Sequence, residues 1–206
     1  MPSSGTVRLV RPAAPLGGGV GVMPAGKRSD TWWTTLPMAT GTYNNSTVPS
    51  NGARVFAFRL AEGFAWDTIG VDVVSNVTSA SATIAIYDLS ALSSRGIGNR
   101  IWTSGLIDCA TTGFKTDATG GRIGPGAYGV VAQSTTADAV LRGVVASSWG
   151  QPLMNFHGSS PATTSQAVAG FNLPSGWALG QGISTETIDS TAGLGNPVPI
   201  VWWRRR

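Results

Sequence analysis

ARVFAFRL at residues 53–60, DTIGVDVVS at 67–75 and SATIAIYD at 81–88 decide the fold of this chain. In each segment apolar side chains recur at every second position, as Ile84 and Ile86 do, and this is the period of a β-strand. Because such alternation separates the side chains onto two faces, we expect one buried and one solvated face. Repeated strands of this kind are typical of an antiparallel sandwich and not of an open parallel sheet.

The same alternation extends along the middle of the chain. No stretch shows a 3.6-residue apolar period, and Leu89 to Ser94 is long enough for one helical turn at most. We therefore predict an all-β, antiparallel β-sandwich over residues 53–147. Its strands are expected near residues 53–60, 67–75, 81–88, 100–107, 113–117, 126–133 and 139–147. Its core is expected to hold Ile69, Val71, Ile84, Ile86, Tyr128 and Val130.

The two flanking regions lack this pattern. Residues 1–52 are interrupted by prolines and glycines, and residues 39–52 have the composition of turns, so the region is predicted to be an extended assembly arm. Residues 148–206 form a loop-rich region rich in Gly, Ser, Thr and Pro. It ends in an extended segment at 197–203, whose prolines suit an edge or exchanged strand better than a central one.

Charge is sparse and lies mostly at the two ends of the sequence. Charged residues make up 12% of the 206, about half of the roughly 25% usual for soluble proteins. Residues 1–30 carry four basic side chains against one acidic, and Arg204 to Arg206 add three more. A nucleic-acid-binding domain would place its basic side chains on a face of the fold, among stacking aromatics. We therefore expect assembly contacts and no specific nucleic-acid recognition.

The sequence predicts neither a signal peptide nor a membrane span. Arg8, Arg11, Pro12 and Pro15 interrupt the first 25 residues before a continuous apolar region can form. A run of about 18 apolar residues, the minimum for a spanning helix, does not occur. We expect a protein that is made in a cytoplasm and has no membrane partner.

Residues suited to catalysis are few. His157 is the only histidine and lies in a loop-like region, and the chain has no nucleophile-elbow motif. His157 and Cys109 together cannot provide the usual zinc ligands, so we expect no metal and no cofactor. Paired carboxylates for glycan hydrolysis remain an open alternative, although aspartates at strand ends commonly have turn roles instead. The candidates for such a pair are Asp67, Asp72, Asp88, Asp108 and Asp117.

Tryptophans near predicted strand ends or loops could bind a ligand. Exposed indoles suit the CH-rich faces of sugars, and nearby polar side chains can bond to the hydroxyls. Each is more often a core or interface residue, so both interpretations stay open. The candidates for glycan contact are Trp66, Trp102, Trp149 and Trp177.

Residues 54–133 also carry a family resemblance. Phe58-Arg59-Leu60 leads to Asp67-Thr68-Ile69-Gly70-Val71, followed by a strand ending in Ile86-Tyr87-Asp88. Thr112-Gly113-Phe114-Lys115 and then Gly124-Pro125-Gly126-Ala127-Tyr128 precede the late strands. This order resembles a jelly-roll module that recurs in bacteriophage virion proteins, especially fibre and spike components. It covers about 80 residues of the chain and is carried by strand and turn order, without a functional signature.

The resemblance implies a non-enzymatic virion structural protein. It would be a head or tail fibre or spike component that forms a homo-oligomer, with a trimer expected, and host-surface glycan is an expected contact. A capsid decoration (cement) protein is the near alternative, and a glycan-degrading enzyme is the distant one. The chain would be assembled into virions in the host cytoplasm, against capsid, portal or tail proteins. The expected assembly contacts are Arg8, Arg11, Arg28, Trp32, Trp33, Trp202 and Trp203.

Overall fold

The computed structural model describes residues 32–34, 43–60, 62–94, 96–145, 170–184, 187 and 197–206. These residues form two antiparallel β-sheets and contain no α-helix. The one helical element among them is the 3₁₀ turn η1 (Ser90–Ser94), where a single turn was predicted. Accordingly, no helix in the described part of the chain is long and apolar enough to cross a membrane. The prediction of an all-β sandwich is confirmed.

The six-stranded sheet contains the segments that decided the fold. Its strand order is β12-β3-β10-β5-β6, and β7 continues the β6 edge by pairing with β5. Its strands are β3 (Ala53–Leu60), β5 (Ser81–Asp88), β6 (Asn99–Thr103), β7 (Ile107–Asp108), β10 (Gly126–Thr135) and β12 (Gly170–Leu173).

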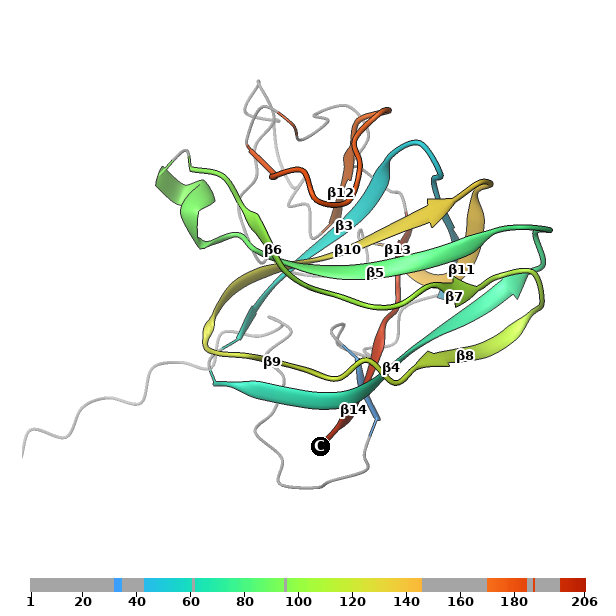
Figure 1. Cartoon of the computed structure of the whole chain (residues 1–206), viewed down its shortest axis with the longest axis horizontal. Helices are drawn as coiled ribbons and strands as arrows, with labels where there is room; N and C mark the ends of the chain where they lie inside the picture. The colour runs from blue at the N-terminus through green and yellow to red at the C-terminus, as the bar shows by residue number, and fades with distance from the viewer. Residues whose placement is uncertain are drawn as a thin grey trace, which may run out of the picture.

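The eight-stranded sheet forms the second layer and includes both flanking regions of the sequence. Its strand order is β1-β14-β4-β11-β13, with β2 on β11 and with β8 and β9 on β4. Its strands are β1 (Trp32–Thr34), β2 (Tyr43–Val48), β4 (Phe64–Ser75), β8 (Gly113–Asp117), β9 (Gly121–Ile123), β11 (Ala139–Val145), β13 (Pro197–Pro199) and β14 (Trp202–Arg205). In Figure 1, β3, β10 and β5 run side by side across one layer, and β4 runs with β8 and β9 in the other.

The main core lies between the two sheets. All six predicted core residues are buried, and Ile69, Val71, Ile84 and Ile86 are completely so. Inward-facing side chains from β3, β4, β5 and β10 meet there, together with Ile200, Val201 and Trp203 from the C-terminal segment. The alternation in the sequence therefore identified the inner face correctly.

A second core covers the outer face of the six-stranded sheet, where the sequence predicted a solvated face. That prediction is wrong for β3, β5 and β10, because of residues 170–183. Within them β12 extends the sheet beside β3, and the residues that follow it lie over the outer face. Phe171, Leu173, Trp177 and Ile183 from this covering segment pack on a shared set of buried residues. That set is Ala53, Val55, Ala57, Ala85, Tyr87, Leu89, Leu92 and Val131.

The flanking regions also differ from their predicted form. Residues 43–48, predicted to be turns, form strand β2, which pairs with residues 139–144 of β11. β13 pairs with β11, and its prolines need not donate a ladder hydrogen bond. β14, which belongs to the segment predicted to be an edge or exchanged strand, instead lies between β4 and β1. The boundaries at residues 52 and 147 stay predictions, but both flanks contribute strands to the sandwich.

Gly143 allows β2 and β13 to approach β11 closely. A Cβ at this position would lie 2.7 Å from both Ser46 Cβ and the Val198 carbonyl oxygen. In the space left free, the buried Ser46 hydroxyl donates a 2.7 Å hydrogen bond to the Pro197 carbonyl. The close approach satisfies a polar group that would otherwise be costly to bury.

Candidate functional site

Three tryptophans that were predicted to be glycan or assembly contacts meet inside the sandwich. Trp66, Trp102 and Trp203 contact one another with ring centroids 4.9 to 5.9 Å apart. Trp66 is only 2% exposed and Trp203 only 1%, while Trp102 is half-buried and donates its indole N–H to the Gly120 carbonyl. Trp66 and Trp203 therefore leave no ring face open to a glycan or to another subunit.

Trp177 lies in the second core. It is 4% exposed and packs against Tyr87, with ring centroids 5.8 Å apart. Its indole N–H donates to the Gly182 carbonyl in the same covering segment. Burial therefore argues against a glycan contact here as well, and indicates an anchor for residues 170–183.

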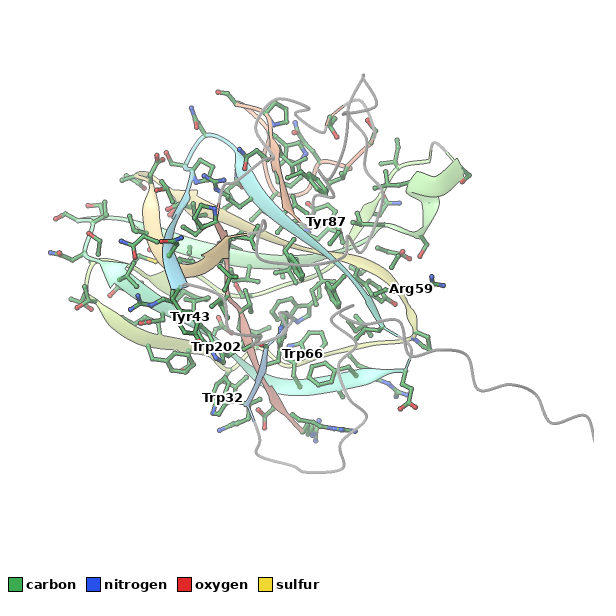
Figure 2. The ribbon with its side chains drawn as sticks, turned by 180° about the vertical axis from the view of Figure 1, so that it is seen from behind. Trp32, Tyr43, Arg59, Trp66, Tyr87 and Trp202 are labelled. Atoms are coloured by element: carbon green, nitrogen blue, oxygen red, sulfur yellow. The ribbon has the colours of Figure 1, made fainter. Side chains whose placement is uncertain are left out.

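Three aromatic side chains with exposed surface lie together on the outer face of the eight-stranded sheet. Phe114 contacts Trp32 with ring centroids 5.3 Å apart and Trp202 with centroids 5.5 Å apart, both edge to face. Trp32 is 37% exposed, Phe114 is 49% exposed and Trp202 is half-buried. We call these three residues the aromatic row. Figure 2 shows Trp32 and Trp202 on the same side of the molecule, where β1 and β14 run.

The strand register explains why the aromatic row faces outward. Trp202 pairs with Gly70, and Phe114 pairs with Asp72, the residue between the buried Val71 and Val73. Cross-strand partners lie on the same face of a sheet. The aromatic row therefore lies on the face that is turned away from the main core.

Gly70 makes room for Phe114 at the centre of the aromatic row. A Cβ on Gly70 would lie 2.3 Å from Phe114 Cζ, and the next nearest atoms belong to the same ring. The absence of a side chain in β4 lets Phe114 reach across from β8 toward Trp202. Gly70 is thus a positioning residue for the row.

An arginine–aspartate pair lies on each side of Gly70 along β4. Arg204 Nε bonds to Asp67 Oδ1 at 2.7 Å, and Arg142 Nε bonds to Asp72 Oδ2 at 3.1 Å. All four side chains are partly exposed. The Arg204 hydrogen bond holds the pKa of Asp67 below its usual value, against a smaller opposing effect of desolvation. Asp67 is therefore suited to be an ionised acceptor and not a general acid.

Two further arginines lie at one end of this face. Arg122 in β9 is exposed and pairs with Ala65, and the backbone N–H of Arg206 donates to the Ala65 carbonyl from the other side of β4. Within the described part of the chain, neither side chain has an ion pair with a carboxylate. We call Arg122 and Arg206 the basic rim.

The other carboxylates weighed for catalysis have local structural roles. Asp88, Asp108 and Asp117 each accept a hydrogen bond from a backbone N–H two residues ahead, as turn aspartates do. Cys109 is fully buried, and burial raises the pKa of its thiol, which makes it unreactive. No group of three or more His, Cys, Asp or Glu that could hold a metal occurs in the described ranges.

Several predicted site residues cannot be compared with the structure. Arg8, Arg11, Arg28, Trp149 and His157 lie outside the described residues, as does the side chain of Trp33. Sequence reasoning missed Phe114, Gly70 and the ion pairs. Phe114 did carry a signal, because it is the one apolar side chain in the β8 sequence GFKTD. A single apolar residue in an otherwise polar strand has no apolar neighbours in that strand with which to form a buried face.

The chain has no recognisable relatives in two comparisons with known proteins. It matches no protein-family model and no curated protein. Function is therefore inferred from the geometry of the outer face and from the resemblance that residues 54–133 carry.

Proposed function

We infer that the sandwich is a jelly roll. We count β7 as a continuation of β6, and β9 as a continuation of β8. The strands from β2 to β11 then make one sheet with the order β2-β11-β4-β8 and a second sheet with the order β3-β10-β5-β6. Every connection crosses between the sheets except the one from β5 to β6. Two four-stranded sheets linked in this way correspond to the two Greek keys of a jelly roll, an architecture of viral capsid and lectin domains.

We propose that the protein is a non-enzymatic structural component of a bacteriophage particle, a head or tail fibre or spike that forms a homotrimer. The observation that carries this proposal is the pairing of β1 with β14. Through this pairing Trp32, the first described residue after the predicted arm, lies beside Arg204 at one edge of the eight-stranded sheet. An arm at one edge suits attachment to capsid, portal or tail proteins, with the rest of the sandwich displayed.

The distribution of carboxylates favours a structural role over glycan hydrolysis. A hydrolase needs two carboxyl groups facing each other across the substrate. Asp67 and Asp72 are each paired with an arginine, and Asp88, Asp108 and Asp117 bond to nearby backbone. Absence of activity on capsule or lipopolysaccharide is the result expected of the purified protein.

Deleting residues 1–30 tests the attachment role. We expect a folded, soluble domain with the far-UV spectrum of a β-protein, because the described strands all begin after residue 31. The truncated chain should no longer incorporate into particles. A full-length variant with Arg8, Arg11 and Arg28 changed to Gln would separate the charge of the arm from its length.

Incorporation of the truncated chain at the normal copy number would refute the attachment role. Locating the full-length chain in particles by cryo-EM distinguishes a fibre or spike from a capsid decoration protein. A decoration protein would lie flat on the shell, whereas a fibre or spike component would project from it.

A further inference from the structure

We propose that the aromatic row, the two adjoining ion pairs and the basic rim form a binding surface for an acidic saccharide. This inference deepens the proposed function, because a displayed virion protein would meet such a polymer on its host. It rests on a different face and on different residues from those first predicted to bind glycan.

The exposed rings supply the apolar part of the surface. Sugars present CH-rich faces that pack on aromatic rings. Trp32 and Phe114 keep more than a third of their surface open although each contacts another ring. In Figure 2, Trp66 lies further inside than Trp32 and Trp202, in agreement with its burial. The surface is therefore offered by Trp32, Phe114 and Trp202, and not by the tryptophans of the core.

The ion pairs supply oriented polar groups on both sides of the rings. Asp67 and Asp72 are five positions apart in β4, about 17 Å at the rise of a strand. Arg204 and Arg142 hold these carboxylates in place. Each pair offers acceptor oxygens next to guanidinium donors, which matches adjacent hydroxyl groups of a sugar. The spacing suits a short run of sugar units lying across the rings.

The basic rim indicates that the saccharide is acidic. Arg122 and Arg206 flank Ala65, at the end of β4 beyond the Asp67–Arg204 pair. Guanidinium groups bind carboxylates and phosphates through paired hydrogen bonds. Because the other two arginines of this face are neutralised by aspartates, the rim gives the face its excess positive charge.

The same arrangement suits a nucleic acid less well. A single-stranded nucleic acid needs positive charge along its whole backbone and ring faces on which bases can stack. Here the excess charge lies at one end, and Phe114 makes edge contacts at 84° and 82° with the two tryptophans. The surface is suited to a ligand with few charges and many CH groups.

Binding of the purified full-length chain to an array of acidic and neutral bacterial polysaccharides tests the proposal. We expect binding to acidic members that weakens as salt is raised. Trp202→Ala and Phe114→Ala should each weaken it about tenfold, and Arg122→Gln should weaken it several-fold and flatten its salt dependence. Leu106→Ala, which removes a side chain that is 70% exposed and lies outside the row, is the matched control and should leave binding unchanged.

Gly70→Ala provides a test that removes no aromatic ring. The added Cβ would displace Phe114, whose exposed ring can move, so the protein should stay folded while binding falls. Three results would each overturn the proposal. The first is unchanged affinity in Gly70→Ala and Phe114→Ala, the second is no binding to any acidic polysaccharide, and the third is equal binding to a single-stranded DNA oligonucleotide. Loss of particle incorporation in these variants with unchanged saccharide binding would identify the face as an assembly contact instead.

The two proposals can fail separately. Deleting residues 1–30 leaves the aromatic row intact, so saccharide binding should persist in the truncated chain even though incorporation is lost. Saccharide binding by the full-length chain, together with its absence from particles, would refute the proposed function alone.

Discussion

The two outer faces of the sandwich differ in how far they are exposed to solvent. The outer face of the six-stranded sheet is apolar and lies under the covering segment, residues 170–183, in which Trp177 is 4% exposed. The outer face of the eight-stranded sheet carries the aromatic row and two arginine–aspartate pairs in partial contact with solvent. The protein thus covers one face with its own chain and leaves aromatic rings exposed on the other.

This difference indicates where a partner would bind. Exposed aromatic rings beside charged groups are typical of binding surfaces, whereas an apolar face that is already covered has a structural role. The covering segment is held by directed contacts as well as by burial. Gln133 donates to the Gly52 and Trp177 carbonyls and accepts from the Leu179 N–H, and the Tyr87 hydroxyl accepts from Gly180.

The largest effect should come from removing the anchor of the covered face. Trp177→Ala is expected to lower the free energy of unfolding by about 3 to 5 kcal/mol, through lost burial and the cavity left behind. Phe114→Ala on the open face should cost less than about 1 kcal/mol. Urea unfolding of both variants measures the difference. Similar losses in the two variants would mean that both faces are structural.

The main core should respond nearly as strongly. Ile86→Ala is expected to lower the free energy of unfolding by about 2 to 5 kcal/mol, because Ile86 lies between the sheets with no exposed surface. Its neighbour Tyr87 faces the covering segment instead. An unchanged thermal midpoint in Ile86→Ala would show that β5 has its two faces reversed.

Substitution of Gln133 should have an intermediate effect on the free energy of unfolding, and that effect should be specific to the covered face. Gln133→Ala should cost about 1 to 3 kcal/mol, because it leaves two backbone carbonyls and one N–H without their partner. Gln181→Ala, which removes one exposed hydrogen bond in the same segment, is the control and should cost less. Hydrogen exchange should then rise at Leu179 before it rises in the main core. Uniform exchange across both sheets would argue against a separately held cover.

The strands and the main core could be predicted from the sequence because their signal is local. Residues 53–60, 81–88 and 113–117 form strands with the predicted limits at both ends. Inward-facing apolar residues such as Ile84 recur with a period of two, and burial of that set fixes the strand register. β2 was missed because its sequence, YNNSTV, has a single aliphatic residue. Its strand conformation is fixed by its pairing with β11.

The candidate site could not be predicted because it is built from distant pairings. Trp32, Trp202, Gly70 and Phe114 come together only through the pairing of β1, β14, β4 and β8. The sequence also does not show which tryptophan is covered. Trp66 and Trp177 are buried because Trp203 and Tyr87, far away in the sequence, pack against them.

The smallest predicted effect concerns the ion pair beside the aromatic row and its dependence on pH. The Arg204 hydrogen bond lowers the pKa of Asp67 in the folded protein below the usual value of 3.8. The unfolded chain therefore binds a proton at Asp67 at higher pH than the folded chain does. It follows that the stabilisation by this pair is present above the unfolded pKa and is lost as pH falls through the folded pKa.

Asp67→Asn should remove that dependence. Because both side chains are partly exposed, we expect the pair to contribute less than about 1 kcal/mol near neutral pH. As pH falls from about 5 to about 2, the free energy of unfolding of the unmodified protein should approach that of Asp67→Asn. Arg204→Gln should show the weak pH dependence of Asp67→Asn and not that of the unmodified protein, because it removes the cause of the lowered pKa of Asp67. A stability difference between the unmodified protein and Asp67→Asn that is constant over this range would show that Arg204 does not stabilise the charged form of Asp67.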